Sequence, residues 1–194
     1  MPTQVQCFDD PNAILEQPVC LNVLSKDVKG TLALNLSQVH ACAQPQCKTL
    51  KTAHTLKLNP ISHAPCDSAF AHALGGTFVV DRLVTAFDQD GMHRGFHAGD
   101  FVWQATPTIQ ILGRMSGMTN EGTHRPPAFS NCQTCDAHGV MEGRLCGRLI
   151  AFNLPAISGC QLIAAYRIKF DPSTTGGTGA VVGVIEGMVI CPCH

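Results

Sequence analysis

Residues 160–170, CQLIAAYRIKF, alternate apolar and polar side chains. The apolar positions are Cys160, Leu162, Ala164, Tyr166, Ile168 and Phe170. Between them stand Gln161, Arg167 and Lys169. Successive side chains of an extended strand point to opposite faces of a sheet, so this period of two is typical of a strand with one buried face. The stretch therefore predicts a half-buried β-strand over 160–170.

Other segments after residue 75 show related strand patterns and are separated by turn-forming sequences. Strands are predicted over 76–87, 95–105, 109–118, 140–150 and 179–190. The linkers contain Asp90-Gly91, Pro126-Pro127 and the Pro/Gly-rich stretch 172–179, which are typical of turns. Short strands joined by such turns indicate an all-β, mostly antiparallel protein.

Glycine recurs four residues apart within these predicted strands. The pairs are Gly95/Gly99, Gly113/Gly117, Gly143/Gly147 and Gly183/Gly187. All fall on the apolar face, and glycine within a strand implies sharp coiling or close approach of a bulky group. Because strongly coiled antiparallel sheets close into barrels, we expect an antiparallel β-barrel or a strongly coiled sandwich. The glycine-spaced strands resemble small barrels of the dirigent and allene-oxide-cyclase kind, and this resemblance implies architecture alone.

The apolar face also predicts how two strands pair. Segments 95–105 and 109–118 are joined by a hairpin-length loop. Pairing Ala105 with Ile109 keeps both apolar faces on one side of the sheet, whereas a slip of one residue would turn one face outward. This register places Phe101 opposite Gly113, and His97 opposite Gly117 as a core residue.

The first 75 residues show little regular periodicity. Residues 31–37, TLALNLS, alternate like a strand, and 12–17 can form a short helix. Residues 38–75 combine His, Cys and Pro without a clear period, which predicts an irregular segment pinned through Cys or His contacts. We therefore expect 1–75 to be an irregular Cys/His-rich arm packed on a barrel of 76–194, in one structural domain.

Composition excludes several classes of partner. Of the 194 residues, 14 % are charged and 45 % are hydrophobic, and the net charge is −1. No basic stripe is available to neutralise phosphates, so no nucleic-acid partner is expected. No apolar run is long enough to span a bilayer, so no membrane association is expected. The low charge leaves much apolar surface, which favours a homo-oligomer.

Cysteine and histidine are abundant, with 11 and 9 residues respectively. The N-terminal sequence has no secretory leader pattern, so the expected compartment is the reducing cytoplasm. In that compartment clustered cysteines are typical of metal ligands or inert thiols. The alternative is a set of disulfides, which would require export by another route.

The strongest short motif is Cys132-Gln-Thr-Cys135, because a Cys-x2-Cys step lets two thiolates reach one ion. We predict a zinc site whose candidate ligands come from two segments. These candidates are Cys132, Cys135, His138, Cys191, Cys193 and His194. The alternatives for Cys132 and Cys135 are a mutual disulfide or a pair of free thiols.

A second group of polar residues is predicted near one mouth of the barrel. His93 and Glu121 are close in the register above, and His124 follows in the same linker. His97 lies four residues from His93, roughly 13 Å along a strand, so the two cannot share an ion unless the strand bulges. His93, Glu121 and His124 are candidate acid/base residues.

Three functions are compatible with these patterns. The first is a zinc-binding barrel that binds a small molecule in its mouth. The second is an isomerase, cyclase or hydrolase that uses His93, Glu121 and His124. The third is a self-assembling structural subunit.

Overall fold

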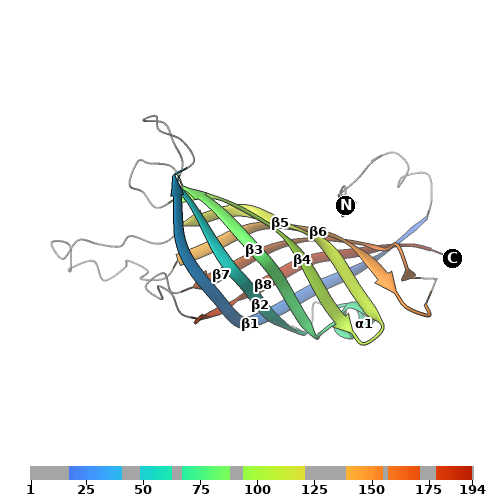
Figure 1. Ribbon diagram of the computed structural model, residues 1–194. Helices are drawn as coiled ribbons and strands as arrows, with labels where there is room; N and C mark the ends of the chain where they lie inside the picture. The colour runs from blue at the N-terminus through green and yellow to red at the C-terminus, as the bar shows by residue number, and fades with distance from the viewer. Residues whose placement is uncertain are drawn as a thin grey trace.

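The computed structural model describes residues 18–40, 49–62, 67–87, 94–120, 139–154, 157–170 and 178–193. In these residues the chain forms a closed antiparallel barrel of eight strands, in which each strand pairs with its neighbours in sequence (Figure 1). The first strand also pairs with the last and closes the barrel. The predicted all-β antiparallel barrel is therefore confirmed.

The strands are long and the only helix in the described part of the chain is short. They are β1 (Val19–His40), β2 (Thr49–Ser62), β3 (Thr77–Phe87), β4 (Arg94–Thr106), β5 (Ile109–Asn120), β6 (Gly139–Ala151), β7 (Gln161–Phe170) and β8 (Thr178–Pro192), with helix α1 (Ala69–His72). The strands predicted after residue 75 coincide with β3 to β8, with ends that differ by at most two residues. This helix is not long and apolar enough to cross a membrane.

The expectation of an irregular segment over 38–75 is wrong for residues 49–62, which form β2. The strand predicted over 31–37 is confirmed, but it is part of the much longer β1. Buried Leu56 and Leu58 alternate with exposed Lys57 and Asn59, so a period-two signal was present in this segment. The barrel thus already begins at β1. The helix expected over 12–17 lies outside the described residues.

The predicted register between β4 and β5 is confirmed over most of its length. Phe101 pairs with Gly113, and His97 pairs with Gly117. The difference lies at the turn, where Thr106 rather than Ala105 pairs with Ile109. The hydroxyl oxygen of Thr106 accepts hydrogen bonds from the backbone N–H groups of Thr108 and Ile109, at 3.2 and 3.0 Å. This local hydrogen bonding tightens the connection.

The inner-facing glycines allow adjacent strands to curve around a narrow interior. A Cβ added to Gly113 would collide with the carbonyl oxygen of Cys146 and would lie 2.6 Å from Cα of Gly147. The same Cβ would lie 2.6 Å from the ring of Phe101. A Cβ added to Gly187 would collide with the backbone of β7 in the same way. At both of these glycines of the repeat, the backbone of the neighbouring strand therefore occupies the space of a side chain.

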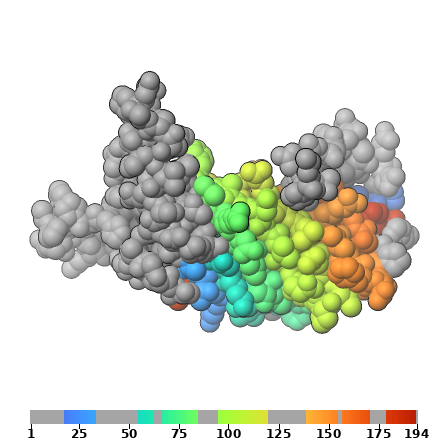
Figure 2. Space-filling view, viewed as in Figure 1, coloured from blue at the N-terminus to red at the C-terminus, as the bar shows by residue number. Residues whose placement is uncertain are grey.

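Bulky apolar side chains fill the interior. Phe78, Trp103, Ile111 and Met115 are fully buried. The rings of Phe78 and Phe101 stack with their centroids 4.6 Å apart. On the face shown in Figure 2, the side chains of β4 and β5 form a closed wall over this core. Because side chains fill the interior, we expect a functional site on the outer wall or at the two ends of the barrel.

Replacing Gly113 by valine tests this steric constraint. We expect Gly113→Val to lower the free energy of unfolding by at least about 1–3 kcal/mol, because its side chain must displace the β6 backbone. The exposed Ser116 on the same strand offers a control, and Ser116→Val should change stability by no more than about 0.5 kcal/mol. Urea unfolding measures both. Equal stability of the two variants would contradict the close approach of β5 and β6.

Candidate functional site

Most sequence-predicted site residues lie outside the described part of the chain. They are His93, Glu121, His124, Cys132, Cys135, His138 and His194. The proposed acid/base group of His93, Glu121 and His124 therefore stays a prediction. The structure does place Cys191 and Cys193, which were expected to complete a zinc site.

Cys191 and Cys193 form disulfides. Cys193 is bonded to Cys20, with their Cα atoms 5.3 Å apart. Cys191 is bonded to Cys160, with their Cα atoms 4.4 Å apart. A metal requires the free thiolate, which a disulfide sulfur no longer provides. The assignment of Cys191 and Cys193 as zinc ligands is therefore wrong.

These bonds also correct the expected zinc function and the expected compartment. Within the described residues, no group of three or more His, Cys, Asp or Glu side chains is arranged to hold a metal ion. Disulfides form and persist in oxidising environments and are rare in a reducing cytosol. The structure thus favours an oxidising compartment over the predicted cytoplasm.

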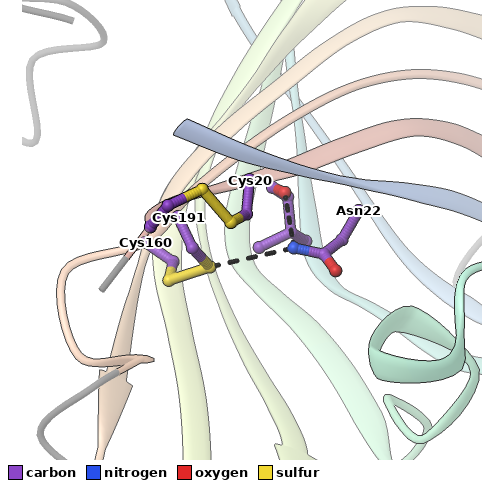
Figure 3. The surroundings of a disulfide bond; sticks show 6 residues. Cys20, Asn22, Cys160 and Cys191 are labelled. Atoms are coloured by element: carbon purple, nitrogen blue, oxygen red, sulfur yellow. Dashed lines mark hydrogen bonds between the residues drawn. A yellow bond between two sulfur atoms is a disulfide. The ribbon is translucent and has the colours of Figure 1, made fainter. Parts of the chain in front are cut away.

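The two disulfides lie together on the inner face of the barrel rim. Cys20 of β1 is the register partner of Cys191 of β8, so both side chains share one face of the sheet. Figure 3 shows the Cys160–Cys191 bond beside the bond to which Cys20 contributes. Cys160 is fully buried, whereas Cys20 is exposed. We call the strands β7, β8 and β1, which carry or adjoin these cysteines, the seam.

The outer face of the seam carries apolar side chains at the same end of the barrel. We call them the seam patch, and they are Val19, Leu21, Val23, Ile163, Met188 and Ile190. Val23 pairs with Met188, which pairs in turn with Ile163, so the patch crosses all three strands. Leu21 is 59 % exposed and Val23 is 47 % exposed. A contiguous exposed apolar surface of this kind is typical of an interaction site.

The other half of the same outer face is charged. A shallow groove of about 550 Å³ is lined by Asp27, Val28, Lys29, Arg167, Lys169, Val182, Gly183 and Val184. The Nε atom of Arg167 also lies 3.7 Å from the Oε2 atom of Glu142, in an exposed ion pair. Basic and acidic side chains therefore adjoin the seam patch on its own strands.

His97 forms a buried polar group inside the barrel. Its Nε2 atom is hydrogen-bonded to the Tyr166 hydroxyl, and its Nδ1 atom lies 2.7 Å from the hydroxyl oxygen of Thr119. Burial lowers the pKa of His97 to about 4 and raises the pKa of Tyr166 above its ordinary value. Both groups are therefore neutral near pH 7. The prediction of a core histidine is confirmed, with side-chain hydroxyls as its partners.

A buried ion pair lies nearer the opposite end of the barrel, beside α1. Lys26 Nζ is 3.0 Å from Asp67 Oδ2, a charge contact without the alignment of a hydrogen bond, and both side chains are at most 1 % exposed. Lys26 also donates to the hydroxyl of Ser62 at 2.9 Å. Burial raises the pKa of Asp67, but the Ser25 backbone N–H and the Lys26 ammonium outweigh it and lower the pKa overall. The Asp67 carboxylate therefore stays charged, and its ion pair with Lys26 ties residues 67–75, which we call the α1 segment, to β1.

The α1 segment also makes backbone contacts with the barrel rim. Trp103 donates its indole N–H to the carbonyl oxygen of Gly75 at 2.6 Å. The backbone N–H of Gly75 donates to the carbonyl oxygen of Ala105 at 2.9 Å. The carbonyl oxygen of His72 also accepts hydrogen bonds from Lys26 Nζ and Ser62 Oγ, at 3.4 and 2.8 Å, so backbone groups hold the described part of this segment.

Comparisons with known protein families, with curated proteins and with solved structures found no match.

The depressed pKa of His97 predicts a pH dependence of stability. Between the unfolded-state pKa of about 6.5 and the folded-state pKa of about 4, only the unfolded chain binds this proton, so stability falls as the pH falls. We expect a loss of roughly 2 kcal/mol between pH 7.5 and pH 5. Urea unfolding at both pH values should show this loss in the wild type and a smaller one in His97→Phe. His72→Gln, at an exposed histidine, is the control. Equal losses in wild type and His97→Phe would contradict the neutral buried imidazole.

Removing one partner of the buried ion pair should strongly destabilise the barrel. Lys26→Met leaves the Asp67 carboxylate buried beside an apolar side chain, and we expect a loss of about 3–5 kcal/mol. Lys29 is an exposed lysine on the same strand, and Lys29→Met should have little effect. Thermal unfolding at pH 7 compares the two. If Lys26→Met were as stable as Lys29→Met, the ion pair would not hold the α1 segment on β1.

Proposed function

We propose that the chain is a disulfide-stabilised structural subunit of an oxidising compartment, and that it associates with further copies of itself through the seam patch. The observation that carries the proposal is the continuous apolar surface across β7, β8 and β1. Covering an exposed Val, Leu or Met side chain contributes about 1.5–3 kcal/mol for complete burial. A second copy offers an identical patch, which is the arrangement of a two-fold interface.

Charges beside the patch support a second copy as its occupant. Asp27 and Glu186 stand on the same outer face as Lys29 and Arg167. A two-fold related copy presents the same acids and bases, so opposite charges can meet at the rim around the apolar centre. The low charge content of the chain, 14 %, is consistent with surface that is covered by association.

The disulfides stabilise the strands that carry the patch. The Cys20–Cys193 bond joins the start of β1 to the residue after β8, across 173 residues of sequence. The Cys160–Cys191 bond joins the residue before β7 to β8. The three strands of the patch are therefore cross-linked at one end. A rigid, pre-ordered surface loses less conformational entropy when it binds.

Two exposed valines provide a matched test. Val23 lies in the seam patch and is 47 % exposed, and Val102 lies on β4, on the other side of the barrel, and is 42 % exposed. We expect light scattering of the oxidised wild type to show a concentration-dependent oligomer. Val23→Lys should raise its dissociation constant at least about tenfold, equivalent to about 1.4 kcal/mol. Val102→Lys should leave it unchanged. A monomeric wild type, or equal effects of the two variants, would refute the proposal.

A further inference from the structure

Four cysteines meet on one face of the seam rim, and one of them stands between two possible partners. Cys191 is bonded to Cys160 beside β7 and is the register partner of Cys20 on β1. Directly opposed residues of antiparallel strands have Cα atoms about 4.5–5.5 Å apart. That spacing falls within the range of about 4.4–6.8 Å found for disulfides. The backbone thus permits a Cys20–Cys191 bond in place of the present pairing.

The sulfur of Cys191 lies within reach of side chains on β1. Asn22, two residues after Cys20 on that strand, directs its amide Nδ2 toward Cys191 Sγ at 4.0 Å (Figure 3). The same amide donates to the carbonyl oxygen of Val189 at 3.3 Å, which fixes its orientation. Cys20 and Asn22 alternate along β1 in step with the inner-facing Leu24, so their side chains lie on the same face of the strand as that of Leu24. A thiolate on Cys20 would therefore face the Cys160–Cys191 bond.

Exposure differs between the two disulfides. Cys20 is exposed and Cys193 is half-buried, so solvent reaches their bond. Cys160 is 0 % exposed and Cys191 is 7 % exposed. Thiol–disulfide exchange requires access of the attacking thiolate to a sulfur atom. An external thiol will thus meet the Cys20–Cys193 bond first.

We propose that these four cysteines form a thiol–disulfide exchange site, which accepts electrons from a small dithiol at the surface and passes them to the buried disulfide. A dithiol thiolate attacks the Cys193 sulfur, the Cys20–Cys193 bond breaks, and the electron pair leaves on Cys20. The Cys20 thiolate attacks the Cys191 sulfur, a Cys20–Cys191 bond forms, and Cys160 leaves as a thiolate.

The second thiolate of the dithiol completes the reaction. It attacks the dithiol's own first sulfur atom, which is bonded to Cys193. The two sulfur atoms of the dithiol then form a disulfide with each other, and Cys193 leaves as a thiolate. The two thiol protons of the dithiol end on Cys160 and Cys193. The dithiol is oxidised by two electrons, and the protein retains one disulfide of the original two, now between Cys20 and Cys191. This product does not depend on self-association, so it can be tested separately.

Partial reduction followed by trapping tests the exchange. The folded wild-type protein is treated with limiting dithiothreitol, alkylated with N-ethylmaleimide, and mapped by proteolysis and mass spectrometry without further reduction. We expect peptides that are cross-linked through Cys20 and Cys191, with the alkylating label on Cys160 and Cys193. Labels on Cys20 and Cys193, with the Cys160–Cys191 bond retained at every dithiol concentration, would overturn the proposal.

A double variant tests the alternative bond directly. Cys160→Ser/Cys193→Ser leaves Cys20 and Cys191 as the remaining cysteines of the cluster, and we expect them to form a disulfide. Cys160→Ser/Cys191→Ser is the matched control, because it retains the present Cys20–Cys193 bond. Free thiols at Cys20 and Cys191 in a folded first variant would count against the exchange site. If that variant does not fold, the trapping experiment on the wild type decides.

Discussion

The close approach of neighbouring backbones inside the barrel is the constraint on which the rest of the structure depends. Where β5 meets β6, the space of a side chain on Gly113 is already occupied by the β6 backbone and the Phe101 ring. Where β8 meets β7, the β7 backbone likewise occupies the space of a side chain on Gly187. Any larger residue would push the strands apart and flatten the sheet. Because glycine stands there, the strands coil enough to close and the remaining interior is filled by aromatic and aliphatic groups.

Two polar side chains inside this apolar interior, His97 and Lys26, are tolerated because both have partners. His97 sits between two hydroxyls near one end, and Lys26 is paired with Asp67 near the other. The first group stays neutral because charging an imidazole in the core is unfavourable. The Asp67 carboxylate stays charged because the Ser25 backbone N–H donates a hydrogen bond to it and Lys26 supplies an opposite charge. Both polar groups are buried toward the ends of the barrel interior. The surfaces that remain accessible to partners are the rim and the outer wall.

Closure of the barrel makes the seam a distinct part of the molecule. It brings the first and last strands together and aligns Cys20 with Cys191. Its inner face holds the four cysteines, and its outer face holds the seam patch. Cross-linking and apolar exposure therefore occur on opposite faces of the same strands. The disulfides of the rim therefore cross-link the strands whose outer face we propose for self-association.

Local pattern in the sequence was enough to predict the strands β3 to β8, the inner-facing glycines and the β4–β5 register, because alternation and a short hairpin are encoded within a few residues. Only residues 31–37 of the long β1 were predicted as a strand, and β2 was missed because nearby His, Cys and Pro residues obscured the alternation of Leu56 and Leu58. The sequence also could not assign the cysteines, and it suggested zinc and a reducing compartment. Cys20 and Cys193 are 173 residues apart, and only barrel closure makes their strands neighbours. Disulfide partners depend on distances between backbones in space, which residue spacing along the chain does not contain.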